Sequence, residues 1–361
     1  MGSLDTIIPT YTVIQADGLY PDDSIEQAIF TVKDGEKPFK VNYIQTNLSP
    51  AGEPLFKPWS SIDPELRAKV DGITILKPDF TAADLELFPN LKVIVRMGAG
   101  YDRVDRVALA KTGVILSNLP DYGTGEIADH AISLALALRR GIILHHDSQR
   151  STPPSLWSHI ETPLVSRIQG ATFGILGIGL IGTAVALRAK AFGWNVLAYD
   201  PYAPNGIEKA LGIERTRDIQ ELFRRSSTLS IHCPATSQTI NLVGYDLLQL
   251  MPSGSIVVNT ARGEVLDLDA AERCLKEGKL TGLGLDVASN EPIPVEGVIH
   301  PLFQAYRDQE EWLRGRLVVS LHTAYHSPEC LDDIRIKSAQ VMRDVFISGL
   351  KMNIIAPHNV K

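Results

Sequence analysis

Residues 173–182 read Phe-Gly-Ile-Leu-Gly-Ile-Gly-Leu-Ile-Gly, and this stretch decides the fold of the second half of the chain. An apolar strand runs into the pattern Gly-x-Gly-x-x-Gly, and a helical run over 183–192 follows it. The first glycine permits a tight turn, the second lets the backbone approach a pyrophosphate, and the third lets the helix pack closely on the strand. We assign five residues of this loop to a dinucleotide: Gly177, Gly179, Leu180, Ile181 and Gly182.

An acidic residue ends the next predicted strand, 196–199. Asp200 follows Gly182 by 18 residues, where a carboxylate can accept hydrogen bonds from the adenosine ribose. Its charge would repel the additional phosphate of NADP, and no arginine follows it directly, so we expect NAD as the cofactor. An alternative stays open in which Asp200 only caps the turn before Pro201.

Outward from this loop, apolar runs alternate with helical patterns in both halves of the chain. The expected strands are 11–16, 41–45, 73–76, 93–96 and 114–117, then 173–176, 196–199, 229–232, 256–259, 283–287 and 317–321. Strands separated by helices predict parallel sheets with helices on their faces, and six strands suit a doubly wound dinucleotide-binding sheet. Turn residues over 118–123 predict a hinge between the halves, and the doubly apolar helix 126–140 fits a domain junction or a subunit interface.

Length and composition narrow the classes of function. A chain of 361 residues exceeds the usual size of one hydrophobic core, which favours two domains. No apolar segment approaches the ~20 residues that span a bilayer, and the loose myristoylation pattern at Met1–Thr6 has no basic cluster after it, so no membrane role is expected. A net charge of -7 argues against nonspecific nucleic-acid binding, and three scattered cysteines indicate a reducing, cytoplasmic address.

Polar residues follow the predicted strands of the second half at their carboxyl ends, where ligands bind in open parallel sheets. The segment after strand 229–232 is assigned to the cofactor through Cys233 and Pro234, and the segment after strand 256–259 through Thr260. Arg262, Glu291 and His322 lie at the same edge. Reduction of a 2-oxo acid needs a cation to hold the substrate carboxylate, a proton donor for the carbonyl oxygen, and a carboxylate to orient that donor.

Arg262, His322 and Glu291 supply one of each group, so we predict that they form the catalytic set. Taken singly, each residue has a plainer interpretation: a surface cation, a structural imidazole and a solvated carboxylate. Their meeting at one sheet edge favours the catalytic interpretation. No metal-binding pattern accompanies them, and we expect no metal.

Five segments together resemble the D-isomer-specific 2-hydroxyacid dehydrogenase family. They are Arg96-Met-Gly-Ala-Gly-Tyr-Asp102, the glycine loop 177–182, Val258-Asn-Thr-Ala-Arg-Gly263, Leu285-Asp-Val-Ala-Ser-Asn-Glu-Pro292 and His322-Thr-Ala-Tyr-His-Ser327. Within the family, residues 186–202 especially resemble the C-terminal-binding-protein co-repressors. The resemblance implies the same catalytic trio. It also implies that Asp286 contacts the nicotinamide carboxamide and that the backbone of Gly98, Ala99 and Gly100 holds the substrate carboxylate.

The resemblance further implies two doubly wound domains. A Rossmann cofactor domain, 121–324, would be inserted in a flavodoxin-like substrate domain made of 1–120 and 325–361, and the protein would be a homodimer. Two departures stand out. One is a charged insertion within 301–316, where we expect a solvated surface helix; the alternatives are a cover over the cleft and an altered partner surface. The other is Tyr325-His326, where the co-repressors carry tryptophan and tyrosine. Tyr325 is assigned to substrate binding. Because this aromatic pair differs from that of the co-repressors, the resemblance does not identify the substrate.

These observations support one leading function and one alternative from another class. The leading hypothesis is an NAD-dependent dehydrogenase that interconverts a small 2-oxo acid and its D-2-hydroxy acid. The alternative is an NAD(H)-binding transcriptional co-repressor of the C-terminal-binding-protein type, which would recruit peptide motifs through its substrate domain.

Overall fold

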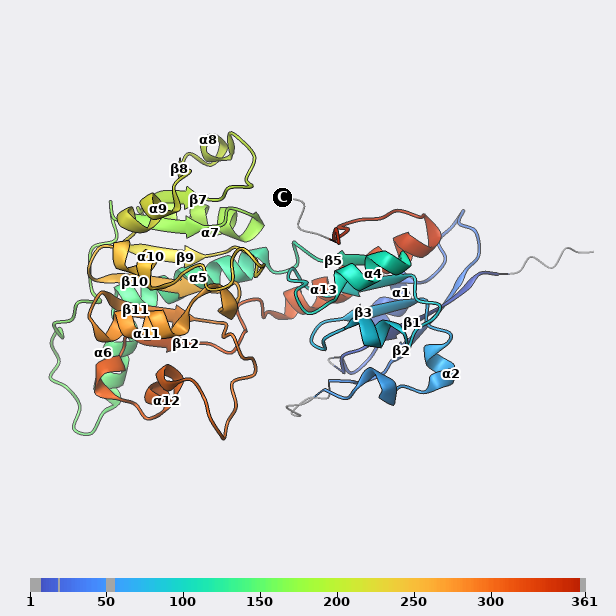
Figure 1. Cartoon of the computed structure of the whole chain (residues 1–361), viewed down its shortest axis with the longest axis horizontal. Coiled ribbons are helices and arrows are strands. Elements are labelled where there is room, and N and C mark those ends of the chain that lie inside the picture. The colour runs from blue at the N-terminus through green and yellow to red at the C-terminus, as the bar shows by residue number, and fades with distance from the viewer. Residues whose placement is uncertain (1–7, 19, 50–55, 358–361) are drawn as a thin grey trace, which may run out of the picture. The chain divides into compact units, whose positions relative to one another are not determined.

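The computed structural model of the chain describes residues 8–18, 20–49 and 56–357, which belong to two compact units (Figure 1). Unit 1 comprises Met1–Tyr122 and Ser327–Lys361, and unit 2 comprises Gly123–His326. The chain therefore passes between the units after residues 122 and 326, whereas the sequence predicted boundaries after 120 and 324. No helix in the described part of the chain is long and apolar enough to cross a membrane. The myristoylation pattern at the N-terminus lies outside the described residues.

Unit 1 is built on a parallel sheet with the flavodoxin-like strand order β2-β1-β3-β4-β5. Its strands are β1 (Thr10–Gln15), β2 (Lys40–Gln45), β3 (Gly72–Ile75), β4 (Val93–Arg96) and β5 (Ile115–Asn118). Its helices are α1 (Ser24–Ile29), α2 (Pro64–Arg67), α3 (Ala82–Leu85), α4 (Arg106–Thr112) and α13 (Pro328–Ile347). Because α13 packs on β4 and α1, the C-terminal segment completes the domain that the N-terminal segment begins.

Unit 2 is built on a seven-stranded parallel sheet in the order β12-β11-β10-β9-β6-β7-β8. Its strands are β6 (Thr172–Leu176), β7 (Asn195–Tyr199), β8 (Glu214–Thr216), β9 (Thr228–Ile231), β10 (Ser255–Asn259), β11 (Leu280–Leu285) and β12 (Leu317–Val319). This is the Rossmann strand order with one further strand. Strand β8 was not predicted, because an edge strand of three polar residues carries no apolar pattern.

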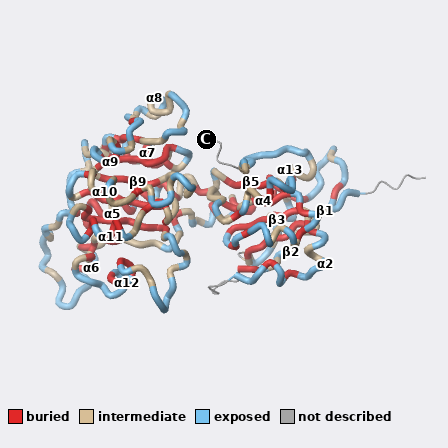
Figure 2. Tube along the Cα trace, in the orientation of Figure 1, coloured by how far each residue is buried: buried red, intermediate tan, exposed pale blue. Residues whose placement is uncertain are grey.

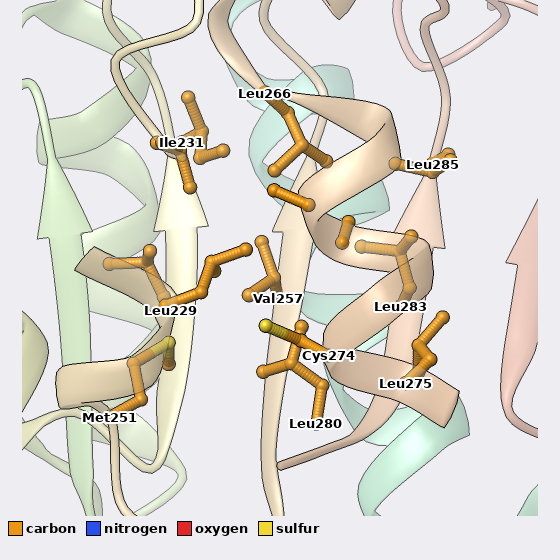
Figure 3. Packing of buried hydrophobic residues seen from close by; sticks show 14 of the residues in the cluster. Leu229, Ile231, Met251, Val257, Leu266, Cys274, Leu275, Leu280, Leu283 and Leu285 are labelled. Carbon is orange, nitrogen blue, oxygen red and sulfur yellow. The ribbon is translucent and has the colours of Figure 1, made fainter. Parts of the chain in front are cut away.

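Helices cover both faces of this sheet, as the two separate apolar cores show. They are α5 (Thr124–Arg139), α6 (Ile142–Arg150), α7 (Leu180–Ala191), α8 (Ile207–Leu211), α9 (Ile219–Arg225), α10 (Tyr245–Leu250), α11 (Leu268–Lys276) and α12 (Pro301–Arg307). Within β10, Val257 belongs to the core under α9 to α12, whereas Ile256 and Val258 belong to the core under α5 and α7. Figure 3 shows α11 packed over the strands in the first core, and Figure 2 shows inner strands of this sheet, such as β9, in the red of buried residues.

Both apolar faces of helix α5 pack inside unit 2, and the helix begins directly after the boundary between the two units. It packs against α7 and against β10 and β11, which accounts for both of its apolar faces. Arg139 near its end is 3% exposed and donates to the carbonyl oxygen of Gly254 at 2.9 Å. The two apolar faces of α5 therefore give no argument for a dimer.

The charged insertion is solvated over residues 306–311, which are exposed, but the residues on either side of that stretch are anchored in the core. Helix α12 buries Leu302 and Phe303, and the short 3-10 helix Glu311–Leu313 buries Leu313 against the same core. Burying a leucine or phenylalanine side chain contributes roughly 1.5–3 kcal/mol to folding, so the insertion is an integral part of unit 2. The prediction missed this because the charged residues outnumber the few apolar anchors.

Candidate active site

The glycine-rich loop connects β6 to α7 and is shaped for a pyrophosphate. Gly177 has a φ of 95°, in the left-handed region that other residues avoid, and a Cβ on Gly182 would lie 2.1 Å from the Gly177 carbonyl oxygen. A Cβ on Gly179 would instead meet nothing within 4 Å, so this side of the loop is open. Gly179 is the N-cap of the 12-residue α7, which has no side-chain cap. An open loop at an uncapped helix N-terminus fits the phosphates of NAD.

Asp200 organises the turn that follows β7. Its Oδ2 accepts from the Ile178 N–H at 3.0 Å, and its Oδ1 accepts from the N–H groups of Tyr202 and Ala203 at 2.8 and 3.1 Å. Asp200 therefore does cap a turn, as the alternative held, and it also ties that turn to the glycine loop. A carboxylate has about four acceptor positions, so roughly one is left for a ribose hydroxyl.

The segment after β9 forms the next wall of the glycine loop, because a Cβ on Gly177 would lie 2.8 Å from the backbone nitrogen of Cys233. The residue His232 is partly exposed, but burial of its imidazole lowers its pKa to about 3, and Nε2 lies 2.7 Å from the Ser230 hydroxyl. Burial raises the pKa of the Cys233 thiol to about 12. Near neutral pH both groups are uncharged, so neither suits an ionic catalytic role. Pro234 beside them is exposed.

The turn after β10 holds Arg262 in place through the buried side chain of Asn259. The Asn259 amide nitrogen donates to the Arg262 carbonyl oxygen at 2.8 Å, and its carbonyl oxygen accepts from the Ala261 N–H at 3.0 Å. Thr260 is 8% exposed, and its hydroxyl has no partner among the described residues. An unsatisfied buried hydroxyl is costly, which fits the predicted contact of Thr260 with the cofactor.

Gly263 lets the Arg262 turn approach the loop that carries Glu291. A Cβ at this position would lie 1.9 Å from the carbonyl carbon of Ala288 and 2.2 Å from the nitrogen of Ser289. Only glycine therefore permits the observed contact between the segments that follow β10 and β11. The sequence pattern did not single out Gly263, because the need for a glycine comes from a segment more than 20 residues away.

Glu291 and His322 form the close pair that the sequence predicted. Glu291 Oε2 lies 2.5 Å from His322 Nδ1, while Oε1 accepts from the Ala288 N–H at 2.7 Å. The Glu291 side chain is 21% exposed and the His322 side chain 41%, so the imidazole remains accessible on a largely buried carboxylate. Because Nδ1 faces Glu291, Nε2 is the ring atom left to exchange a proton with a substrate.

The remaining predicted residues lie in three places. Asp286 is 2% exposed at the end of β11, and its carboxylate accepts from donors of the protein itself. Tyr325 follows His322 in unit 2 and is partly buried.

Gly98, Ala99 and Gly100 follow β4 in unit 1. The Asn118 amide nitrogen donates to the Ala99 carbonyl oxygen at 2.7 Å, and the Leu119 N–H donates to the Gly98 carbonyl oxygen at 3.1 Å. This loop therefore stands at the carboxyl edge of the first sheet, supported from the end of β5.

A Rossmann sheet with an open glycine loop and an acid–imidazole pair at its carboxyl edge defines a nicotinamide-dependent oxidoreductase. The family model for D-isomer-specific 2-hydroxyacid dehydrogenases, NAD binding domain, matches residues 132–312, which lie within unit 2. The chain belongs to this family, and its cofactor is NAD.

Relatives and solved structures agree with this assignment. The chain is 35% identical over 225 residues to the glyoxylate reductase of Korarchaeum cryptofilum, covering 62% of this chain and 67% of that protein. It is 36% identical over 208 residues to the D-3-phosphoglycerate dehydrogenase of Methanocaldococcus jannaschii, covering 58% of this chain and 39% of that protein. The Aquifex aeolicus D-lactate dehydrogenase structure with NAD and lactic acid has a TM-score of 0.76 at 24% identity, covering 95% and 98% of the two chains, and supports the fold.

The family assignment makes the protein an NAD-dependent dehydrogenase. The relatives named above are reductases or dehydrogenases, and the co-repressor alternative is not favoured.

Proposed function

We propose that this protein interconverts a small 2-oxo acid and its D-2-hydroxy acid with NAD(H), using Arg262, Glu291 and His322. The observation that carries the proposal is the 2.5 Å contact between His322 Nδ1 and Glu291 Oε2 at the carboxyl edge of the NAD-binding sheet. A carboxylate on Nδ1 fixes the orientation of the ring and leaves Nε2 to face the substrate. The pair therefore supplies the proton donor that carbonyl reduction needs.

His322 and Arg262 have separate tasks in the proposed reaction. When bound, NADH supplies the hydride that adds to the carbonyl carbon. His322 Nε2 gives its proton to the carbonyl oxygen, so the product is a hydroxyl group and a neutral imidazole. In the reverse direction the imidazole takes that proton back. The planar guanidinium of Arg262 binds the substrate carboxylate with two parallel hydrogen bonds, and Asn259 fixes the backbone from which Arg262 projects.

The residues proposed to hold NAD(H) come from the carboxyl ends of neighbouring strands. The loop 177–182 would bind the pyrophosphate, Asp200 the adenosine ribose, and Thr260 would donate its hydroxyl to the cofactor. Cys233 and Pro234 would line the same wall. Asp286 is proposed to stand near the nicotinamide carboxamide. Unit 1 would act as the substrate domain, with the backbone of Gly98–Gly100 toward the substrate carboxylate and Tyr325 of unit 2 toward its side chain.

Two properties of the whole protein are also proposed. A homodimer would cover apolar side chains that are exposed in a single chain, among them Leu156 at 89% and Trp157 at 93% exposure. A cytoplasmic address fits the three cysteines, Cys233, Cys274 and Cys330, which are scattered along the sequence with no paired spacing.

The function is tested with a panel of 2-oxo acids of increasing size and charge, assayed by NADH oxidation. We expect turnover of at least one of them, with the D-2-hydroxy acid as the product on chiral analysis. The L-enantiomer as the product, or no turnover across the panel by protein that still binds NADH, would refute the proposal.

The choice between cofactors is expected to depend on Asp200. Asp200→Asn keeps the size and one acceptor but removes the charge, so the preference for NADH over NADPH should shrink by about ten- to hundredfold, or ~1.4–2.8 kcal/mol. Asp200→Ala should narrow the preference too, but it should also weaken NADH binding, because it frees the glycine loop at Ile178. Steady-state kinetics with both cofactors measure the two effects. Equal kcat/KM values of the wild-type enzyme with NADH and NADPH would show that Asp200 does not face the ribose.

A further inference from the structure

The short turn that carries His322 is held in an unusual conformation by a buried carboxylate. His322 has a φ of 54°, a left-handed value that non-glycine residues adopt only when the surroundings enforce it. Asp286 provides the enforcement. Its backbone carbonyl oxygen accepts from the His322 N–H at 2.7 Å, and its Oδ1 and Oδ2 accept from the N–H groups of Thr323 and Ala324 at 2.9 and 3.0 Å.

A second layer holds Asp286 in turn. The Ser320 hydroxyl donates to Asp286 Oδ1 at 2.6 Å, and the same hydroxyl oxygen lies 2.8 Å from Nε2 of His130. A serine hydroxyl has one proton, and here it goes to the carboxylate. His130 must therefore donate its own Nε2–H to the Ser320 oxygen. The two bonds form a directional chain from the imidazole to the hydroxyl to the carboxylate.

The position of His130 suits a supporting role and not contact with the reacting atoms. It stands on α5, 190 residues before Ser320, and its side chain is 28% exposed. Its Nε2 lies 3.8 Å from Asp286 Oδ1, so it is adjacent to the buried charge without replacing Ser320 as its hydrogen-bond partner. The hydrogen bonds within such a chain strengthen one another, because each donor is polarised by the next acceptor.

We propose that His130 is a positioning residue for His322, acting through Ser320 and Asp286 on the turn 322–324. This role rests on the proposed function, in which His322 Nε2 exchanges a proton with the substrate. Loss of the His130 donor frees the Ser320 hydroxyl to rotate, weakens the hold on Asp286 Oδ1 and lets the left-handed turn relax. His322 then leaves its alignment with Glu291, and proton transfer slows while the glycine loop, far along the sheet, still binds NADH.

The kinetic test compares four single variants and the double variant His130→Leu/Ser320→Ala. His130→Leu removes the donor, His130→Gln keeps an amide N–H for Ser320, and Ser320→Ala removes the link. His146→Leu, on exposed α6 surface, is the control. His130→Leu and Ser320→Ala should each lower kcat about ten- to hundredfold, with a much smaller change in the KM for NADH, as expected for a displaced catalytic group. His130→Gln should restore most of the rate. The double variant should lose no more than either single variant, because both break one chain.

A spectroscopic measurement separates this proposal from the proposed function. The proton shared by His322 Nδ1 and Glu291 should give a strongly deshielded NMR resonance, assigned by its loss in Glu291→Gln. That resonance should shift or broaden in His130→Leu and Ser320→Ala but not in His130→Gln or His146→Leu, whether or not an oxo acid is turned over. If His130→Leu fails to fold, Ser320→Ala decides the test. An unchanged resonance and kcat in folded Ser320→Ala, or additive losses in the double variant, would overturn the role of His130.

Discussion

His322→Gln should lower kcat for oxo-acid reduction by about 10²- to 10⁴-fold, the range that a positioned general acid contributes. The amide side chain keeps a similar size and a hydrogen bond toward Glu291, but its N–H groups are far too weakly acidic to give a proton to the carbonyl oxygen. NADH affinity should stay within a small factor of the wild-type value, because the glycine loop is untouched. Single-turnover kinetics and NADH titration by fluorescence measure the two quantities.

Glu291→Gln is the companion variant that tests how the pair works. It removes the negative charge 2.5 Å from His322 Nδ1 and keeps the size of the side chain. Because the amide is a weaker hydrogen-bond acceptor for His322 Nδ1, the ring should lose its fixed orientation, and kcat for reduction should fall by about 10- to 100-fold. NADH affinity should stay close to the wild-type value, and the measurements are those used for His322→Gln. A Glu291→Gln variant with wild-type kcat would contradict the pairing of Glu291 with His322.

Arg262→Lys should lower kcat/KM for the oxo acid by about 30- to 1000-fold, equivalent to ~2–4 kcal/mol. Lysine keeps the charge, but a single ammonium cannot make the two parallel hydrogen bonds that a guanidinium offers a carboxylate. The KM for NADH should change little. Arg224→Lys, an exposed replacement on α9, is the matched control and should behave as wild type. If Arg262→Lys showed wild-type kinetics with the oxo acid, Arg262 would not be the carboxylate clamp.

The sequence predicts the site residues only where it also predicts the carboxyl ends of the strands that carry them. Parallel strands place their carboxyl ends at one edge, so the residues after β10, β11 and β12 had to meet once the strands were recognised. Arg262, Glu291 and His322 follow those strands, and the Glu291–His322 contact confirms that two of them lie side by side. The contacts that orient them could not be predicted in this way. Asn259 hydrogen-bonds the backbone of Arg262, and Gly263 packs against Ala288. No sequence pattern indicates either contact, because each depends on how the loops pack together.

The sequence by itself determined the Rossmann half of the protein, because strand, glycine turn and helix are specified by neighbours within 173–192. It also determined the first sheet, whose five apolar runs match β1 to β5 in position. Only the tertiary structure decided which buried groups act together. The contact between His130 and Ser320 spans 190 residues, and no local pattern distinguishes this histidine from the others in the chain. A periodic pattern reports which face of an element is buried, whereas a hydrogen bond between distant side chains depends on how whole elements pack.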